Sequence, residues 1–180
     1  MNVVLGVTGS ISAYKAVDIM RLFQKNGHSV RVILTQAALQ FIPALPFETF
    51  CPGHVYSDMF EKHQDPLVHI NVSTDGDLLL IAPASANIIG KMANGIADDL
   101  LSSTYLAFHR HVIVSPAMNS YMYDHPAVQA NLARLASYGV GILEPAVGSL
   151  ACKTEGKGKL PDLQRIYDFS IQFVTGAVKV

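Results

Sequence analysis

The chain is short of charge. Lys, Arg, Asp and Glu make up 15% of its 180 residues, where a soluble domain usually carries about 25%. Intrinsic disorder combines low hydrophobicity with high net charge, so an apolar fraction of 50% and a net charge of -1 exclude it. The near-neutral net charge also argues against non-specific electrostatic binding to nucleic acid. The missing charges need an explanation, because a monomer normally covers much of its surface with polar groups.

Long hydrophobic runs and cysteine clusters are also missing. No uninterrupted apolar run reaches the ~20 residues that a membrane-spanning helix needs, and the longest candidate, 78–89, is broken by a proline and two polar residues. The two cysteines, Cys51 and Cys152, form no CxxC motif or metal cluster. We therefore expect a reduced, cytoplasmic protein with free thiols and with neither a membrane nor a nucleic-acid partner.

Apolar segments alternate with helical patterns along the whole chain. The expected strands cover 2–8, 29–34, 77–82, 111–115 and 140–143. The expected helices cover about 13–26, 35–42, 87–93, 97–109, 126–138 and 161–174, and 47–66 and 148–159 are expected to be loops. Strands that are apolar on both faces and joined by helices predict a parallel sheet covered on both sides. The sequence thus predicts one α/β domain over 1–180, doubly wound and Rossmann- or flavodoxin-like.

The segments that come after the expected strands indicate where a ligand would bind, since such folds bind ligands at the carboxyl ends of their strands. These segments are uncharged, small and rich in hydroxyl and amide groups: 8–12, 35–36, 83–87 and 116–119. The first turn is not GxGxxG, and Thr35 rather than an acidic residue ends the second strand, so the ribose grip of an NAD site is missing. A mononucleotide such as FMN fits better. A tight turn without any ligand remains the alternative for Gly9 and Ser10.

Two asparagines and one histidine stand out near these strand ends. Asn87 and Asn119 each come after a strand and a proline, where a turn or helix cap is the simple interpretation. Asn119 could instead hold a carboxylate as a neutral donor, which matters if the carboxylate leaves as CO2, because a salt bridge would over-stabilise the ground state. His69, in an apolar stretch before the central strand, is either a structural histidine or a base in a pocket. No histidine pair has the HExxH spacing, so we expect no metal.

Four motifs in chain order carry a resemblance to a known family. Residues 83–88 read Pro-Ala-Ser-Ala-Asn-Ile and resemble its PASANT motif, and 116–123 read Pro-Ala-Met-Asn-Ser-Tyr-Met-Tyr and resemble its PxMNxxMW motif. His69 precedes the first at a fitting distance, and residues 151–158 resemble a substrate-clamp loop with its cysteine. From residue 1 to about 165 the chain resembles the homo-oligomeric flavin-containing Cys decarboxylases.

Three departures from the family pattern affect the details. Ile88 replaces the Thr of PASANT, which removes a hydroxyl near the flavin, and Tyr123 replaces the Trp of the second motif. The clamp reads Ala-Cys-Lys-Thr-Glu over 151–155 where Ala-Cys-Gly-Asp is commoner, but it keeps its cysteine.

The resemblance implies an FMN cofactor and a carboxy-lyase reaction. The expected substrate is 4'-phosphopantothenoylcysteine and the product 4'-phosphopantetheine, in coenzyme A biosynthesis, through thioaldehyde and enethiolate intermediates. A carboxylate on a saturated carbon has nowhere to put the electrons that CO2 leaves behind, and a neighbouring C=S group supplies that sink. The cycle is redox-neutral overall, so it needs no NAD(P)H, and the cofactor carries the hard chemistry.

The resemblance also assigns roles to individual residues. His69 would be the base, Asn119 would hold the carboxylate, Cys152 would donate a proton, and Met122 would pack at the active site. Lys153, Lys157 and Lys159 would meet the substrate phosphate, or else form a solvated basic loop. The implied FMN contacts are Gly9, Ser10, Ser12, Thr35, Ser85, Ala86, Asn87 and Ala117.

The sequence leaves several competing functions and several possible partners open. A peptidyl-cysteine decarboxylase, a non-catalytic flavin-binding regulatory subunit such as a phosphatase inhibitor, and a flavin prenyltransferase are the competing functions. The resemblance implies a homo-oligomer, a trimer or dodecamer, and a synthetase domain for phosphopantothenoylcysteine as a possible further partner. Arg110 is the only residue of 100–123 that belongs to the Lys, Arg, Asp and Glu set. Because the cores of protein interfaces are depleted in charge, this distribution also favours subunit contacts.

Overall fold

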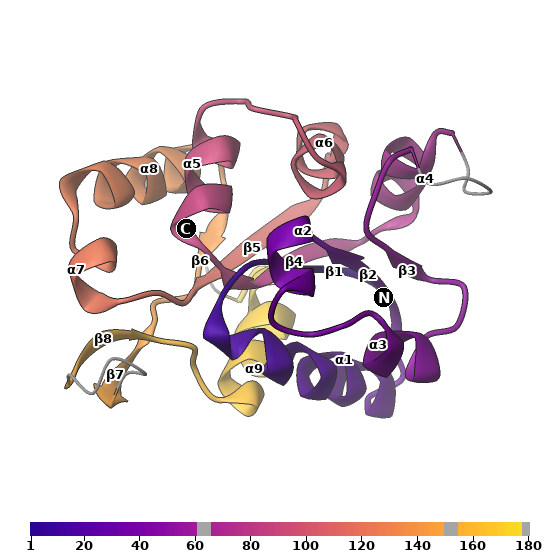
Figure 1. The fold of residues 1–180 in the computed structure, drawn as a ribbon, viewed down its shortest axis with the longest axis horizontal. Coiled ribbons are helices and arrows are strands. Elements are labelled where there is room, and N and C mark those ends of the chain that lie inside the picture. The colour runs from indigo at the N-terminus through magenta and orange to yellow at the C-terminus, as the bar shows by residue number, and fades with distance from the viewer. Residues whose placement is uncertain (61–65, 150–154, 178–180) are drawn as a thin grey trace.

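A six-stranded, fully parallel sheet forms the centre of the molecule, as the computed structural model shows for residues 1–60, 66–149 and 155–177 (Figure 1). The strand order is β3-β2-β1-β4-β5-β6, and every neighbouring pair is parallel. The strands are β1 (Asn2–Val7), β2 (Ser29–Leu34), β3 (Val55–Tyr56), β4 (Leu78–Ala84), β5 (His111–Pro116) and β6 (Gly141–Ile142). The predicted doubly wound, flavodoxin-like α/β domain is confirmed.

Helices cover both faces of this sheet (Figure 1). One face carries α1 (Ala16–Lys25) and α9 (Leu163–Val174). The other carries α4 (Val68–Asp75), α5 (Ala86–Ala93), α6 (Leu100–Ala107) and α8 (Pro126–Ser137). The shorter elements are the 3₁₀ helix η1 (Ile11–Lys15), α2 (Gln36–Leu39), α3 (Leu45–Phe50), α7 (Ser120–Tyr123) and the strands β7 (Ala146–Ser149) and β8 (Glu155–Lys159).

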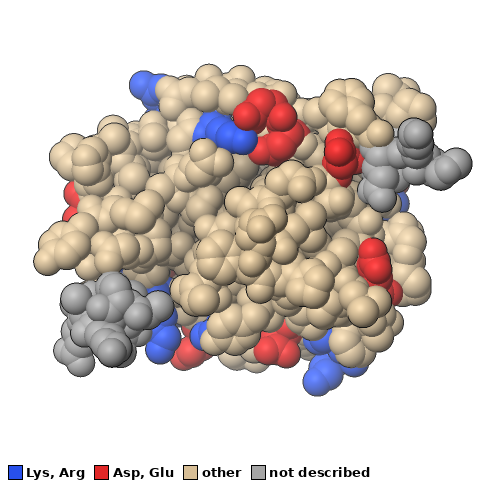
Figure 2. All heavy atoms as spheres, in the orientation of Figure 1, with Lys and Arg blue, Asp and Glu red and all other residues tan. Residues whose placement is uncertain are grey.

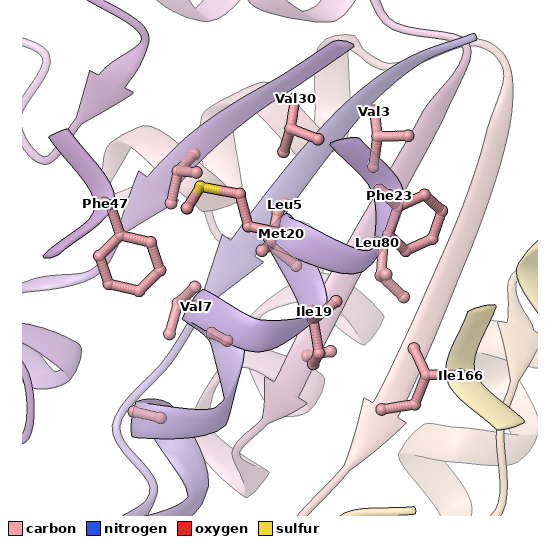
Figure 3. Packing of buried hydrophobic residues seen from close by; sticks show 14 of the residues in the cluster. Val3, Leu5, Val7, Ile19, Met20, Phe23, Val30, Phe47, Leu80 and Ile166 are labelled. Atoms are coloured by element: carbon pink, nitrogen blue, oxygen red, sulfur yellow. The ribbon is translucent and has the colours of Figure 1, made fainter. Parts of the chain in front are cut away.

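Alternation along the strands divides the core into two halves. Successive side chains of a strand point to opposite faces, so Leu80 packs against the α1 and α9 side while its neighbour Leu79 packs against the α5 and α8 side. Figure 3 shows the first half, where Leu5, Leu80 and Phe23 meet under α1. Burying one such side chain contributes about 1.5–3 kcal/mol. This two-sided burial explains why the strands read as continuous apolar runs.

Two segments expected to be loops contain regular structure. The first, 47–66, includes residues 47–50 of α3 and the edge strand β3, because Pro46 stands in the first turn of α3 and does not end the preceding helix. The second, 148–159, includes β8 and the end of β7, which pair antiparallel with Gly148 opposite Gly156. Contacts outside the segment fix this hairpin: Leu160, the next residue, is buried, and Met118 N–H donates to Gly158 O. The local composition could not reveal these partners.

The strand order fixes where the chain leaves an open crevice. β1 pairs with β2 on one side and β4 on the other, so the connections after β1 and β4 run away from each other. Such a switch point leaves space at the carboxyl ends of the two strands.

The described part of the chain gives direct observations on membrane spans, metal sites and one of the two cysteines. Over the described residues, none of the helices has the length and apolar character needed to cross a membrane, and His, Cys, Asp and Glu form no cluster of three suited to a metal ion. Cys51 is a free, buried thiol whose Sγ donates to Val30 O at 2.7 Å. Burial raises the pKa of this thiol.

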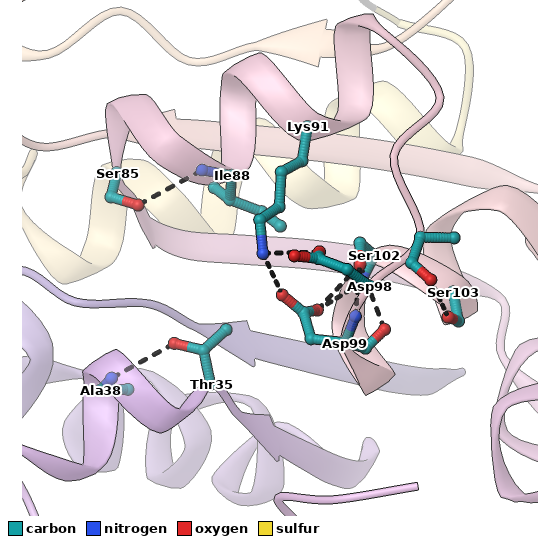
Figure 4. A network of polar contacts seen from close by, with 10 residues as sticks. Thr35, Ala38, Ser85, Ile88, Lys91, Asp98, Asp99, Ser102 and Ser103 are labelled. Atoms are coloured by element: carbon teal, nitrogen blue, oxygen red, sulfur yellow. Dashed lines mark hydrogen bonds and ion pairs between the residues drawn. The ribbon is translucent and has the colours of Figure 1, made fainter.

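A compact polar network ties the end of α5 to the start of α6 (Figure 4). Asp99 caps α6, because its Oδ1 accepts from Ser102 N–H at 2.8 Å while Ser102 Oγ accepts from Asp99 N–H. Lys91 Nζ pairs with Asp99 at 2.7 Å and with Asp98 at 2.6 Å. Burial raises the pKa of the Asp99 carboxyl, but the bonds from Lys91 and Ser102 outweigh it, so that pKa lies below its usual value.

We expect Asp99→Ala to lower the free energy of unfolding at neutral pH by about 1–2 kcal/mol, since it removes a helix cap and an ion pair. A carboxylate with a depressed folded-state pKa stabilises fully above its unfolded pKa and loses this effect as the pH falls through the folded value. The difference between wild type and variant, measured by denaturant unfolding, should therefore shrink in acid. Asp98→Ala is the matched control and should cost less, because Asp98 is 59% exposed and caps nothing. Equal losses would contradict this account.

Candidate functional site

A pocket of 490 Å³ opens at the carboxyl ends of β1, β4 and β5, at the switch point of the sheet. Its volume lies in the range of about 300–1,000 Å³ typical of small-molecule sites. The residues lining it are Gly9, Ser10, Ile11, Ser12, Tyr14, Lys15, Phe41, Ser85, Ala86, Ala117, Met118, Asn119, Met122, Gly158 and Lys159. The fold thus collects segments from distant parts of the sequence in one place.

Many of the residues singled out from the sequence meet in this pocket. They are Gly9, Ser10, Ser12, Ser85, Ala86, Ala117, Asn119, Met122 and Lys159. Thr35, Asn87, His69 and Lys157 are not among the lining residues. Cys152 and Lys153 lie outside the described residues.

The turn after β1 is held by hydrogen bonds and by close packing. Ser10 Oγ donates to Ala117 O at 3.2 Å and accepts from Ser12 N–H at 3.4 Å, which joins the first turn to the segment after β5. Gly9 has no room for a side chain, because a Cβ there would lie 2.7 Å from the Cβ of Ala37. Thr35 caps α2, which carries Ala37, through a bond from Ala38 N–H. Thr35 therefore supports the turn from behind rather than lining the pocket.

Thr8 is a site-building residue that sequence reasoning missed. It is 2% exposed, and its Oγ1 donates to Pro83 O at 2.7 Å and accepts from Ser85 N–H at 2.9 Å. Ser85 in turn caps α5 by accepting from Ile88 N–H. One hydroxyl thus fixes the ends of β1 and β4 relative to each other and sets the direction in which α5 begins. A threonine at a strand end is a weak signal, and its partners become evident only once β1 and β4 are paired.

The segment after β5 presents Asn119 and Met122 to the pocket. Ala117 N–H donates to Ala84 O, which keeps this segment beside the end of β4. Asn119 caps the single turn α7, with its Oδ1 accepting from Tyr121 N–H at 2.9 Å. A carboxylate bound in the pocket would lie beside this neutral amide, because Asn119 is one of the lining residues. Met122 is half exposed and contributes an apolar wall.

Two lysines and an apolar rim complete the lining. Lys15 and Lys159 both line the pocket, and Lys15 was not expected from the sequence, where it belonged to a helix pattern. Ile11, Tyr14 and Phe41 are 60%, 59% and 51% exposed, which is unusual for large apolar side chains that lie together. Figure 2 shows a face on which charged side chains lie mostly toward the outline. The neutral, apolar rim accounts for part of the charge deficit.

His69 lies apart from this pocket within one chain. It belongs to the first turn of α4, and α4 contributes no lining residue. Its Nδ1 is buried and has no hydrogen-bond partner among the residues that the structure describes. A buried polar atom of this kind costs free energy unless it finds a partner.

These motifs and their arrangement agree with a comparison against known families. The sequence profile of the Flavoprotein family matches residues 1–175. The chain belongs to the Flavoprotein family.

Relatives within the Flavoprotein family carry related functions. The coenzyme A biosynthesis bifunctional protein CoaBC of Bacillus subtilis is 45% identical over 167 residues, which are 92% of this chain and 41% of that protein. A probable phosphopantothenoylcysteine decarboxylase of Streptococcus mutans is 42% identical over 169 residues, which are 92% of this chain and 94% of that protein. The chain thus spans less than half the length of the bifunctional relative.

Two solved structures of similar fold extend this comparison. A PPC decarboxylase mutant complexed with pantothenoylaminoethenethiol has a TM-score of 0.84 and 30% identity, with 96% of this chain and 97% of that chain covered. The FMN-dependent cysteine decarboxylase SpaF has a TM-score of 0.80 and 30% identity, with 99% and 98% covered.

We expect Thr8→Val to lower the free energy of unfolding by about 1–3 kcal/mol, because it leaves Pro83 O and Ser85 N–H without their shared hydroxyl. Thr8→Ser keeps the hydroxyl and is the matched control, with a smaller loss. Denaturant unfolding without added ligand measures both variants. A valine variant as stable as the serine variant would show that the bridge contributes nothing.

Proposed function

We propose that this chain is an FMN-dependent carboxy-lyase that converts 4'-phosphopantothenoylcysteine to 4'-phosphopantetheine in coenzyme A biosynthesis. The observation that carries the proposal is the pocket itself, which brings the turn after β1, the start of α5 and the segment around Asn119 together at the switch point. Relatives bearing the names of this pathway support the substrate. The Flavoprotein family and the similarity to an FMN-dependent decarboxylase support the cofactor.

The donors in the pocket fit a flavin mononucleotide. The hydroxyls of Ser10, Ser12 and Ser85, together with the backbone around Gly9, offer uncharged donors at helix starts, where a phosphate binds well. Lys15 adds a positive charge nearby, and the apolar lining suits a planar ring system. FMN, when bound, supplies a group that can take up a hydride from the substrate and give it back.

Asn119 would orient the substrate carboxylate. Its amide is neutral, so it holds the carboxylate without the strong ground-state stabilisation that an ion pair would give. Met122 lines the same pocket and would add an apolar contact beside the reacting carbon. Lys159 belongs to the lining of the same pocket and is our candidate for the substrate phosphate, whereas Lys157 is paired with Glu144. The roles of Cys152 as proton donor and of Lys153 stay predictions from the sequence.

His69 would act as the base, and a homo-oligomer would bring it to a pocket. The exposed apolar rim formed by Ile11, Tyr14 and Phe41 favours a surface that another copy covers. His69 as a whole is only partly buried, so the accessible part of its ring, and not the buried Nδ1, is what a neighbouring copy could reach. We propose a trimer, or a dodecamer built from trimers, with His69 of one copy facing the pocket of its neighbour. The bifunctional relatives suggest a synthetase domain as a further partner.

A peptidyl-cysteine decarboxylase is the second candidate, favoured by the similarity to SpaF, an FMN-dependent cysteine decarboxylase. Both reactions need the same base and the same pocket, and they differ in the steps after CO2 is lost. The free thiol of Cys51 fits the reducing cytoplasm that either pathway would use.

We expect the purified protein to carry a yellow flavin that is released as FMN on denaturation. Incubation with 4'-phosphopantothenoylcysteine should yield a product lighter by one CO2 and fully reduced, as read by mass spectrometry. A peptide with a C-terminal cysteine, offered in parallel, should react at least ten times more slowly, by order of magnitude for a substrate that lacks the complementary contacts. Faster reaction of the peptide would replace the first proposal with the second.

We expect His69→Asn to reduce CO2 release by about 10²–10⁴-fold, the usual contribution of a general base, while the bound flavin spectrum stays unchanged. His125→Asn is the matched control, since His125 caps α8 and lies outside the pocket lining. Turnover of His69→Asn at the wild-type rate would refute the base role.

Mixed oligomers locate the base. If His69 and Asn119 act from different copies, inactive His69→Asn and Asn119→Ala chains should regain part of the activity when they are unfolded and refolded together. No recovery, with oligomers formed normally, would place both residues in the same copy.

A further inference from the structure

The hairpin strand β8 touches the pocket through its backbone. Met118 N–H donates to Gly158 O at 3.0 Å, and Gly158 and Lys159 both line the pocket. The approach is close, because a Cβ at Gly158 would collide with Met118 O. One backbone bond therefore joins β8 to the segment that carries Asn119, and small shifts of β8 move Lys159 relative to Asn119.

A group of three side chains lies directly beside this contact. Tyr123, at the end of α7, is 3% exposed, and its hydroxyl donates to Glu144 Oε2 at 3.0 Å. Lys157 forms an ion pair with the same carboxylate oxygen, and its Nζ lies 5.2 Å from the centroid of the Tyr123 ring. Gln129 Nε2 donates to Tyr123 O at 2.5 Å and fixes the backbone of α7 from the other side. Glu144 thus joins α7 to β8.

The protonation states at neutral pH suit this arrangement. The bond to Glu144 raises the pKa of Lys157, so its ammonium stays charged. Burial raises the pKa of Glu144, but Lys157 and Tyr123 outweigh it and hold that pKa below its usual value. Burial and the neighbouring carboxylate raise the pKa of Tyr123, so its phenol remains a donor. At neutral pH the Glu144 carboxylate is therefore paired with one cation, Lys157, and accepts from one neutral donor, Tyr123.

We propose that Lys157, Glu144 and Tyr123 are positioning residues that hold β8 against α7 and so set the distance between Lys159 and Asn119 across the pocket. The inference rests on the proposed function, in which these two residues hold the phosphate and the carboxylate of one substrate. It assigns Lys157 a role different from direct contact with the phosphate. The hydroxyl of Tyr123 is central to it, because it donates to the Glu144 carboxylate.

The test compares Tyr123→Phe, Glu144→Gln and Lys157→Met, with Tyr121→Phe and Lys25→Met as matched controls. Tyr121 is 81% exposed on the same helix, and Lys25 lies at the end of α1. KM and kcat are measured for the substrate with and without its phosphate. We expect all three network variants to raise KM about threefold to tenfold for the phosphorylated substrate, the size expected from losing one partly exposed charged contact, with little change in kcat and unchanged bound flavin.

A direct phosphate contact gives a different result. Lys157→Met alone would then raise KM for the phosphorylated substrate, while Tyr123→Phe and Glu144→Gln would leave it unchanged. That outcome would overturn the proposal. The charge-swapped double variant, Glu144→Lys with Lys157→Glu, distinguishes a positioning network from a direct phosphate contact. In a positioning network, its KM for the phosphorylated substrate should lie closer to wild type than the KM of either single charge reversal. With a direct phosphate contact, the swap should not restore KM.

Amide exchange provides a readout that does not depend on turnover. Hydrogen–deuterium exchange of a peptide containing Met118 should be faster in the three network variants than in the two controls, because the bond to Gly158 O opens more often. Unchanged exchange in Tyr123→Phe, which removes a single hydroxyl, would overturn the proposal even if wild type were inactive on this substrate. An inactive wild type with faster exchange in the variants would instead refute only the proposed function.

Discussion

The pairing of β1 with β4 is the constraint on which the site depends. Because these two strands are neighbours in the sheet but separated in the sequence by β2 and β3, their connections run in opposite directions. The backbone at their carboxyl ends is left without a covering element, and the pocket occupies that space. Thr8 then reinforces the junction, since one buried hydroxyl bonds to Pro83 and Ser85 at the end of β4. The hydrophobic core provides the framework, and a few polar atoms at the strand ends give the pocket a defined shape.

The site relies on neutral donors rather than on charge. Its hydroxyls and amides come from turns and helix caps, where the backbone already requires polar partners, so the same atoms serve structure and binding. Lys15 and Lys159 are the charged groups in the lining. If the site releases CO2 as proposed, a carboxylate held by the neutral amide of Asn119 is lost more readily than one held in an ion pair. The low charge of the chain is therefore a property of its pocket as well as of its surface.

The sequence allowed the fold and much of the pocket to be predicted because both depend on local patterns. Continuous apolar runs identified the sheet, and the turn after each run supplied Ser10, Ser85 and Asn119. The features that the sequence did not reveal depend on tertiary partners. Pro46 has the same local character whether it ends one helix or stands in the first turn of the next, and the structure shows the second arrangement, with Phe47 buried. Thr8, Lys15 and the apolar rim likewise gain their meaning from neighbours distant in the chain.

The backbone contact between Gly158 and Met118 constrains how the two segments that it joins can change during evolution. Two segments joined without side chains at the point of contact have no tolerance for bulk there, so drift in one is limited by the other. Residues 118–123 and 144–159 should then behave as one inherited unit. Recombination that separates them would join segments with mismatched spacing, whereas exchange of both together would transfer one wall of the pocket intact.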